Sequence, residues 1–187
     1  MGSCGNSKCC QSITELLYYS ENEDSKIIIS NQIKKGGYND KLLCTKYHQI
    51  LNEIRENPSN FIIESKSYNL AEIFIKLKPS NPIKFSEENI NNIISYLKEE
   101  EDTKVSIHQK EIKIAKMIHY GYIKKICMYE VDTIYDDLRQ NLWYFLQQNE
   151  DDLELILSTY YEYIIIICLP LNNELSRLIF IFYNRTW

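Results

Sequence analysis

The spacing of apolar residues along the chain predicts amphipathic helices through its middle part. The first helix begins after Asp40 and ends before Pro58, and its apolar residues recur three or four positions apart: Cys44, Tyr47, Leu51 and Ile54. In the second helix Ser86 is the expected N-cap, and one face is apolar: Ile90, Ile93, Ile94 and Leu97.

Two further helices follow in the same pattern. The third runs from Gln109 to Tyr120, is ended by Gly121, and is expected to face the core with Ile112, Ala115 and Ile118. The fourth begins after Asp136 and Asp137, with Trp143 beside an apolar face formed by Leu138, Leu142, Phe145 and Leu146.

The C-terminal part changes from helical spacing to runs of β-branched and aromatic residues. Tyr163 to Leu169 and Leu178 to Tyr183 are joined by a polar turn at Asn172-Asn173, which predicts a β-hairpin whose first strand is buried on both faces. A third strand is expected near residues 122–127. About four helices packed on a small sheet place the chain in the α/β class.

The first ten residues, MGSCGNSKCC, predict a lipid anchor. Removal of Met1 leaves Gly2 as an acceptor for myristate, although Asn6 stands where Ser or Thr is usual. A single myristoyl chain binds a bilayer only marginally, so a second element is needed, and Lys8 is the only basic residue among the first twenty-five. Palmitate on Cys4, Cys9 or Cys10 supplies that element. The alternatives are a metal-binding cluster, for which no His lies nearby, or a remnant of an expression tag.

This pattern divides the chain into residues 1–20 as the anchor, 21–39 as a linker or docked segment, and 40–187 as one domain. The net charge of −5 argues against nucleic-acid binding. The N-terminus has no apolar core of a signal peptide, and no apolar run approaches the roughly 20 residues of a membrane-spanning helix. We therefore expect a lipid-anchored protein, with its thiols reduced, on the cytosolic face of a membrane.

Several strings of the body, over roughly residues 40 to 184, resemble the CAP superfamily (cysteine-rich secretory proteins, antigen 5 and pathogenesis-related proteins). Asn52 and Arg55 are three apart on the first helix, with Leu51 where that family carries His. The other strings follow in the family's order: Gly121-Tyr122, Glu130, Trp143, Tyr160-Tyr161-Glu162, the strand Ile164 to Ile167, and Arg177 to Tyr183. The resemblance implies an α-β-α sandwich with an antiparallel sheet in the middle, and one branch of the family is intracellular, myristoylated and bound to Golgi membranes.

The family's cleft carries two His and two Glu, which bind a divalent metal in some members. Here Glu130 is the one retained acid, His108 is the one candidate for the first His, and Asp152 stands at the second His position. This set is a degenerate cleft, for which we expect no metal and no cofactor. Glu130 is more simply explained as a carboxylate that ties down the chain after the third helix.

No other pattern predicts catalysis. His48 and His119 are single helical histidines, and Cys127 and Cys168 lie among Ile residues as small apolar fillers. The acidic residues Asp132, Asp136 and Asp137 lack the spacing of a calcium loop. We expect a non-enzymatic, membrane-tethered interaction module with an unknown protein partner. The alternatives are a protein that binds a lipid or sterol and, ranked last, a metal-dependent enzyme.

Overall fold

The computed structural model describes residues 39–62, 77–100, 105–119, 121–134, 137–171 and 175–186, which belong to the unit Gly37–Trp187. Along these residues the chain forms the following elements: α3 (Lys41–Glu56), α4 (Pro58–Ile62), β1 (Lys84–Phe85), α6 (Ile90–Glu99), α7 (Ile107–His119), β2 (Ile123–Ile134), α8 (Leu138–Gln148), the 3₁₀ helix η1 (Glu150–Asp152), α9 (Leu153–Leu157), β3 (Tyr163–Pro170) and β4 (Leu175–Arg185).

The strands form one four-stranded sheet in the order β1-β3-β4-β2. β3 and β4 are antiparallel, with Ile165 opposite Ile181, and β2 pairs antiparallel with the other side of β4. The predicted hairpin and third strand are therefore confirmed. The sheet is mixed, however, because β1 runs parallel to β3, with Lys84 opposite Tyr163. The prediction of an antiparallel sheet missed β1, since two residues are too short to produce an alternating pattern.

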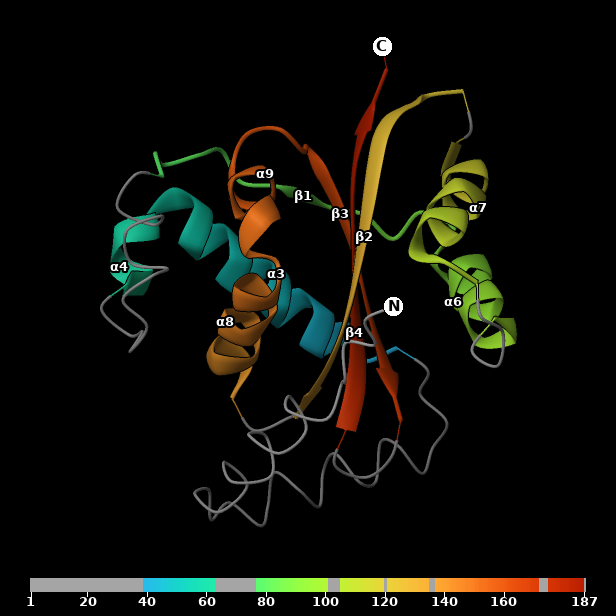
Figure 1. Ribbon diagram of the computed structural model, residues 1–187, viewed down its shortest axis with the longest axis horizontal. Coiled ribbons are helices and arrows are strands. Elements are labelled where there is room, and N and C mark those ends of the chain that lie inside the picture. The colour runs from blue at the N-terminus through green and yellow to red at the C-terminus, as the bar shows by residue number, and fades with distance from the viewer. Residues whose placement is uncertain are drawn as a thin grey trace, which may run out of the picture. The chain divides into compact units, whose positions relative to one another are not determined.

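Helices cover both faces of the sheet, so the chain has an α/β fold in three layers (Figure 1). Even-numbered residues of β3 and β4 face α3, α4, α8 and α9, whereas odd-numbered residues face α6 and α7. The side chains that the two strands bury on the first face are Ile164, Ile166, Cys168, Leu178, Phe180 and Phe182, and on the second face Ile165, Ile167, Ile179, Ile181 and Tyr183. The two strands are thus apolar on both faces because both faces are covered.

The ends of α3 and α8 follow from their N-caps. The carboxylate of Asp40 accepts a hydrogen bond from the backbone N–H of Leu43 (3.0 Å), and the carboxylate of Asp137 accepts from Arg139 and Gln140. Both helices bury the apolar faces that their spacing predicts. Just before α3, Asn39 Oδ1 accepts hydrogen bonds from the Cys44 thiol (3.1 Å) and from the backbone N–H of Cys168 on β3 (3.0 Å).

One side of α3 holds the extended segment that leads into β1. Asn52 Oδ1 accepts from the backbone N–H of Ile83 (2.8 Å), and its Nδ2 donates to the carbonyl oxygen of the same residue (3.2 Å). His48 Nε2, one helical turn earlier, donates to that carbonyl oxygen as well (2.7 Å). An amide and an imidazole on one helix face therefore replace the strand partner that Ile83 lacks on this side.

Arg55 continues this contact as a buried side chain, 1% exposed. Its Nε donates to the carbonyl oxygen of Asn81 (3.1 Å), and its Nη1 donates to that of Ile156 at the end of α9 (2.8 Å). Burial lowers the pKa of this guanidinium to about 10, so it stays charged at neutral pH. The Asn and Arg that carry the family resemblance thus act here as ties between α3, the β1 segment and α9.

Two details of the predicted helices are wrong. α6 begins at Ile90, after Asn89 in the left-handed region (φ 53°), and Ser86 is not its N-cap. The Ser86 hydroxyl instead accepts a hydrogen bond from Tyr183 Oη (2.9 Å) on β4. On α7 the buried residues are Ile114 and Ile118, whereas Ile112, expected to face inward, is 44% exposed.

The core of the α3–α8 side provides a direct test of this packing. Leu142 on α8 is fully buried and Leu42 on α3 is 63% exposed. We expect Leu142→Ala to lower the free energy of unfolding by about 2–5 kcal/mol, because it removes buried methyl groups and leaves a cavity. The matched Leu42→Ala change is expected to stay within about 0.5 kcal/mol. Urea unfolding followed by circular dichroism measures both, and equal losses would contradict the assignment of these two faces.

Candidate functional site

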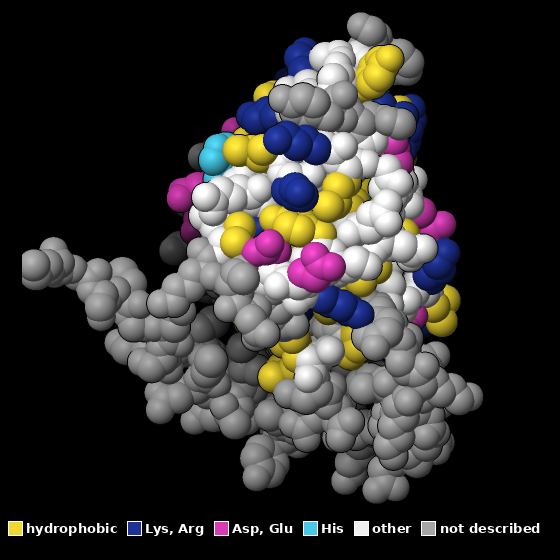
Figure 2. Space-filling model, turned by 90° about the vertical axis from the view of Figure 1, so that its right-hand side faces the viewer, with side chains coloured by type: hydrophobic (Ala, Val, Ile, Leu, Met, Phe, Trp, Pro, Cys, Tyr) yellow, Lys and Arg dark blue, Asp and Glu magenta, His cyan; other side chains and the backbone are white. Residues whose placement is uncertain are grey.

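The outer surface of α6 and α7 carries a groove of about 650 Å³. Its apolar lining comes from both helices and from the segment between them: Tyr96, Val105, Ile112 and Met117. Figure 2 shows this side of the molecule, where hydrophobic side chains gather among basic and acidic ones. Of these four side chains only Ile112 is exposed, at 44%, so the apolar part of the groove is small.

The groove exists because α7 has apolar residues on two faces. Ile114 and Ile118, one turn apart, pack on the sheet and leave Ile112 and half-buried Met117 to the outer side. The sequence predicts a buried Ile112 because Ile112, Ala115 and Ile118 recur three positions apart. Only contact with the sheet decides between the two apolar faces of this helix.

Charged residues lie at both ends of the groove. Lys116 is exposed near the end of α7 and Lys113 is exposed at the middle of that helix, whereas Glu99 and Glu100 lie at the end of α6. The side-chain amide of Asn89, at the start of α6, donates to the carbonyl oxygen of Met117 near the end of α7. The two helices are therefore antiparallel, which puts Lys116 and the two acidic residues at opposite ends.

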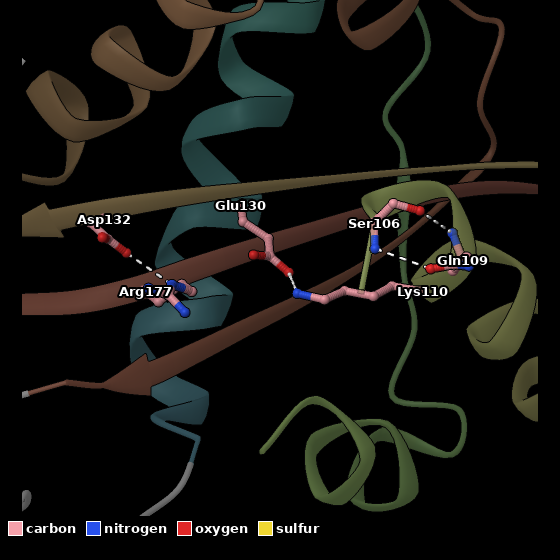
Figure 3. Close-up of polar contacts among 6 residues, drawn as sticks. All are labelled: Ser106, Gln109, Lys110, Glu130, Asp132 and Arg177. Atoms are coloured by element: carbon pink, nitrogen blue, oxygen red, sulfur yellow. Dashed lines mark hydrogen bonds and ion pairs between the residues drawn. The ribbon is translucent and has the colours of Figure 1, made fainter. Parts of the chain in front are cut away.

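The start of α7 is fixed by a reciprocal cap (Figure 3). The backbone N–H of Gln109 donates to Ser106 Oγ (3.3 Å), and the backbone N–H of Ser106 donates to Gln109 Oε1 (3.2 Å). This is the capping-box arrangement, which satisfies two of the otherwise unpaired N–H groups at the helix start. It fixes the start of α7 and leaves Lys110 in the first turn of the helix.

Lys110 joins α7 to the sheet through an ion pair with Glu130 on β2, with Nζ and Oε1 2.9 Å apart (Figure 3). Both side chains are largely buried, 14% and 19% exposed. Farther along the same face of the sheet, Arg177 Nε lies 2.9 Å from Asp132 Oδ1, but this pair is more exposed, at 30% and 51%. Glu111, next to Lys110, accepts a hydrogen bond at Oε1 from the backbone N–H of Met128 on β2 (2.9 Å).

The structure does not bring together the three residues of the predicted cleft. Glu130 pairs with Lys110, and the imidazole of His108 is 80% exposed on α7, where it lies 3.5 Å from Glu111. Asp152 ends η1 on the opposite side of the sheet, near the ring of Tyr129. Tyr129 and Glu130 are consecutive on β2 and point to opposite faces, so the sheet separates Asp152 from Glu130.

Around Asp152 the phenol and thiol groups are held in their neutral forms. Burial raises the pKa of Tyr129, and the neighbouring Cys127 and Asp152 raise it further. Burial likewise raises the pKa of Tyr161 and of Cys127. A thiol and phenols that resist ionisation are poor nucleophiles and poor metal ligands, so this cluster acts as packing between the sheet and α8–α9.

The predicted lipidation residues Gly2, Cys4, Cys9 and Cys10 lie outside the described residues, as does the amphipathic patch at residues 13–18. Within the described ranges, no helix has the length and hydropathy to cross a bilayer. The same ranges contain no group of three His, Cys, Asp or Glu residues that could hold a metal ion.

Comparison with known proteins gives no relative: no family model, no curated protein and no solved structure matches this chain. The similarity to the CAP superfamily therefore rests on the quoted sequence strings alone.

The two ion pairs differ in exposure, and we therefore expect them to differ in coupling energy. In a double-mutant cycle with Lys110→Met and Glu130→Gln, we expect a coupling of about 1–2 kcal/mol, because the pair is largely shielded from water. The same cycle on Asp132 and Arg177 is expected to give less than about 1 kcal/mol, since solvent screens the more exposed pair. Urea unfolding of the single and double variants measures both couplings. The ranking fails if the Asp132–Arg177 pair proves the more strongly coupled.

Because several tyrosine side chains are buried, we expect the folded protein to lose stability at alkaline pH. Burial raises the pKa of Tyr47, Tyr129 and Tyr161 in the folded state, whereas unfolded tyrosines ionise at about pH 10. Above about pH 10 the unfolded chain therefore releases protons that the folded chain keeps, and the free energy of unfolding falls as the pH rises.

The measurement is a series of urea midpoints at increasing pH. Tyr47→Phe should weaken the alkaline loss, because the variant has one fewer group to ionise. A midpoint that stays constant through the ionisation range of free tyrosine would refute the assigned burial.

Proposed function

We propose that this chain is a lipid-anchored, non-catalytic interaction module that works on the cytosolic face of a membrane. Its first ten residues carry acyl chains and its folded unit recognises a protein partner. The observation that carries this proposal is Gly2 directly after Met1, with Cys4, Cys9 and Cys10 in the next eight positions. The proposal requires translation to start at Met1.

The spacing of these residues satisfies the requirement for two anchoring signals. A myristoyl chain on Gly2 gives a membrane association constant on the order of 10⁴ M⁻¹, which is too weak for stable attachment. Lys8 is the only basic residue near it, so electrostatic attraction to anionic lipids adds little. Thioester-linked palmitate on a neighbouring cysteine adds the second apolar chain.

The folded unit supports this division of roles among the six cysteines. Cys44 and Cys168 are 0% and 1% exposed, and Cys127 on β2 is half-buried. Burial raises the pKa of both Cys44 and Cys127, so these thiols rarely form the thiolate that attacks an acyl donor. Cys44 and Cys168 are therefore closed to an acyl donor, and the half-buried Cys127 is a poorer acceptor than an exposed cysteine.

The groove on α6 and α7 supports the interaction role. It carries exposed Ile112 and half-buried Met117 beside residues of both charges, and it lies on the side of the sheet away from the ties made by α3. A lipid- or sterol-binding role remains the alternative, and extraction of labelled sterol from liposomes by the purified chain tests it.

The anchor is tested by fractionation of cells that produce the full chain. Gly2→Ala should move the protein from the membrane to the soluble fraction, because alanine at this position does not accept myristate. The matched Gly5→Ala change should leave it on the membrane. Changing Cys4, Cys9 and Cys10 together to Ser should leave a loosely held protein that dilution releases, whereas Cys127→Ser should have no effect.

Mass spectrometry of the N-terminal peptide reads the modification itself and the start of translation. The proposal fails if this peptide carries no fatty acyl group, or if the Gly2→Ala and triple Cys→Ser variants both stay with the membrane.

A further inference from the structure

One end of the sheet gathers basic and aromatic side chains from its four strands. β2 and β3 begin at this end and β4 ends there (Figure 1). Lys84 of β1 lies opposite Tyr163 of β3, which in turn lies opposite Tyr183 of β4. Lys125 of β2 lies opposite Asn184, the next residue of β4. Residues far apart in the sequence therefore form one surface, which we call the basic end.

Two hydrogen bonds fix the loops that border the basic end. The side-chain amide of Asn184 donates to the carbonyl oxygen of Tyr160, just before β3. The backbone N–H of Thr186 donates to the carbonyl oxygen of Tyr122, just before β2 (2.6 Å). The side chains of Tyr122 and Tyr160 are nevertheless 63% and 42% exposed. Both aromatic rings are thus open to solvent on backbone that is tied to β4.

Three cations of the basic end lie over tyrosine rings. Lys84 Nζ is 5.3 Å from the ring centroid of Tyr163, and the guanidinium carbon of Arg185 is 5.0 Å from the same centroid. Lys125 Nζ is 4.6 Å from the ring centroid of Tyr160. An aromatic face attracts a cation without neutralising it, so these side chains are held in place and keep their charge.

The positive charge of the basic end comes from three lysines. Lys84, Lys124 and Lys125 are exposed, and none of them forms an ion pair with a carboxylate in the described part of the chain. Arg185 adds no net charge, because its guanidinium pairs with Glu88. The lysines are therefore the groups that can meet an external anion.

Two carboxylates near the lysines reduce this charge in part. Glu162 is exposed directly before β3, and half-buried Asp152 interacts electrostatically with Lys125. Three lysines against two carboxylates still leave a positive end on a chain whose net charge is −5. The basic end thus has the opposite sign of charge to the chain as a whole.

We propose that the basic end docks on an anionic lipid surface, with its three lysines among the headgroups and the rings of Tyr122 and Tyr160 in the interfacial layer. A lysine close to an anionic leaflet strengthens binding by about fivefold. Tyrosine suits the same depth, because its ring is apolar and its hydroxyl is polar. The exposed tyrosines and lysines therefore match the two layers of one membrane interface.

A lipid surface fits the basic end better than a nucleic acid does. Single-stranded nucleic acids bind tyrosine by stacking bases on its ring faces. The rings of Tyr160 and Tyr163 already carry cations, and Tyr163 also stacks on Tyr183 with the ring centroids 5.2 Å apart. Three lysines are also few for a phosphate backbone, whose binding relies on many neutralised charges.

This inference deepens the membrane role proposed above, on which its biological setting rests, by naming the part of the folded unit that meets the membrane. Lys8 alone gives the N-terminal segment little attraction to anionic lipids, and the basic end supplies it from the folded unit. Three lysines bind weakly on their own. The acyl chains therefore hold the protein at the membrane, and the basic end sets its orientation there.

The test is cosedimentation of the full, unacylated chain with vesicles. We expect binding to vesicles of phosphatidylcholine mixed with phosphatidylserine and none to vesicles of phosphatidylcholine alone. Binding should weaken as salt is added, because salt screens the attraction between exposed charges. The anchor is read separately, by fractionation of the acylated chain in cells, so either proposal can fail without the other.

The charge variant is Lys84→Gln with Lys125→Gln. It should lower the affinity for the mixed vesicles by at least about tenfold, because two lysines no longer meet the anionic headgroups. The matched control, Lys46→Gln with Lys113→Gln, removes the same charge at exposed sites on α3 and α7 and should bind like the wild type.

The aromatic variant is Tyr122→Ala, which should lower the affinity several-fold, because it removes a ring from the interfacial layer without changing the charge. Its control is Leu42→Ala on α3, a side chain that is equally exposed at 63% and lies outside the basic end. Circular dichroism verifies that each variant is folded before its binding is compared.

The proposal is overturned if the wild-type chain does not bind the mixed vesicles, or if the charge variant and its control lose affinity equally. It is also overturned if the chain binds a single-stranded RNA oligonucleotide but not the vesicles, which would assign the basic end to nucleic acid.

Discussion

Burial of the β3–β4 hairpin on both faces is the constraint on which the rest of the fold depends. Side chains such as Phe180 and Ile181 alternate between two separate hydrophobic clusters, so each face needs its own cover of helices. α3, α8 and α9 supply one cover, and α6 and α7 supply the other. Removal of either layer would expose a contiguous apolar surface of the sheet to water, which a monomeric domain rarely tolerates. α6 and α7 therefore pack against the sheet with their inner faces and form the groove with their outer faces.

Much of this fold is readable from the sequence, because strong periodicity and strong caps coincide. α3 and α8 begin at the expected Asp residues and bury the expected faces, and the hairpin pairs along its apolar runs. What failed has a physical cause in each case. β1 is two residues long, too short for an alternating pattern; it pairs with β3, and Asn52 holds Ile83 just before it. Ile112 lies on one of two apolar faces of α7, and only the sheet decides which face is buried.

The candidate site was less predictable than the fold. The sequence favours Glu130 as a carboxylate that ties down the chain after α7; in the structure it pairs with Lys110 in the first turn of α7 instead. His108 and Asp152 were grouped with it by order along the chain, but order does not reveal that consecutive residues of β2 serve opposite faces of the sheet. No local sequence motif predicts the groove on α6 and α7, because it is formed by the outward-facing side of α7 together with the outward-facing side of α6.

The side chains of Asn39 and Glu111 have one more consequence. Asn39 accepts a hydrogen bond from the backbone N–H of Cys168 on β3, and Glu111 accepts one from the backbone N–H of Met128 on the edge strand β2. An edge strand with unpaired N–H and C=O groups can pair with a strand of another molecule, which is a common route to aggregation of β-rich proteins. The Asn39 amide oxygen and the Glu111 carboxylate oxygen occupy one N–H on β3 and one on β2, which removes these two positions from pairing with a strand of another molecule.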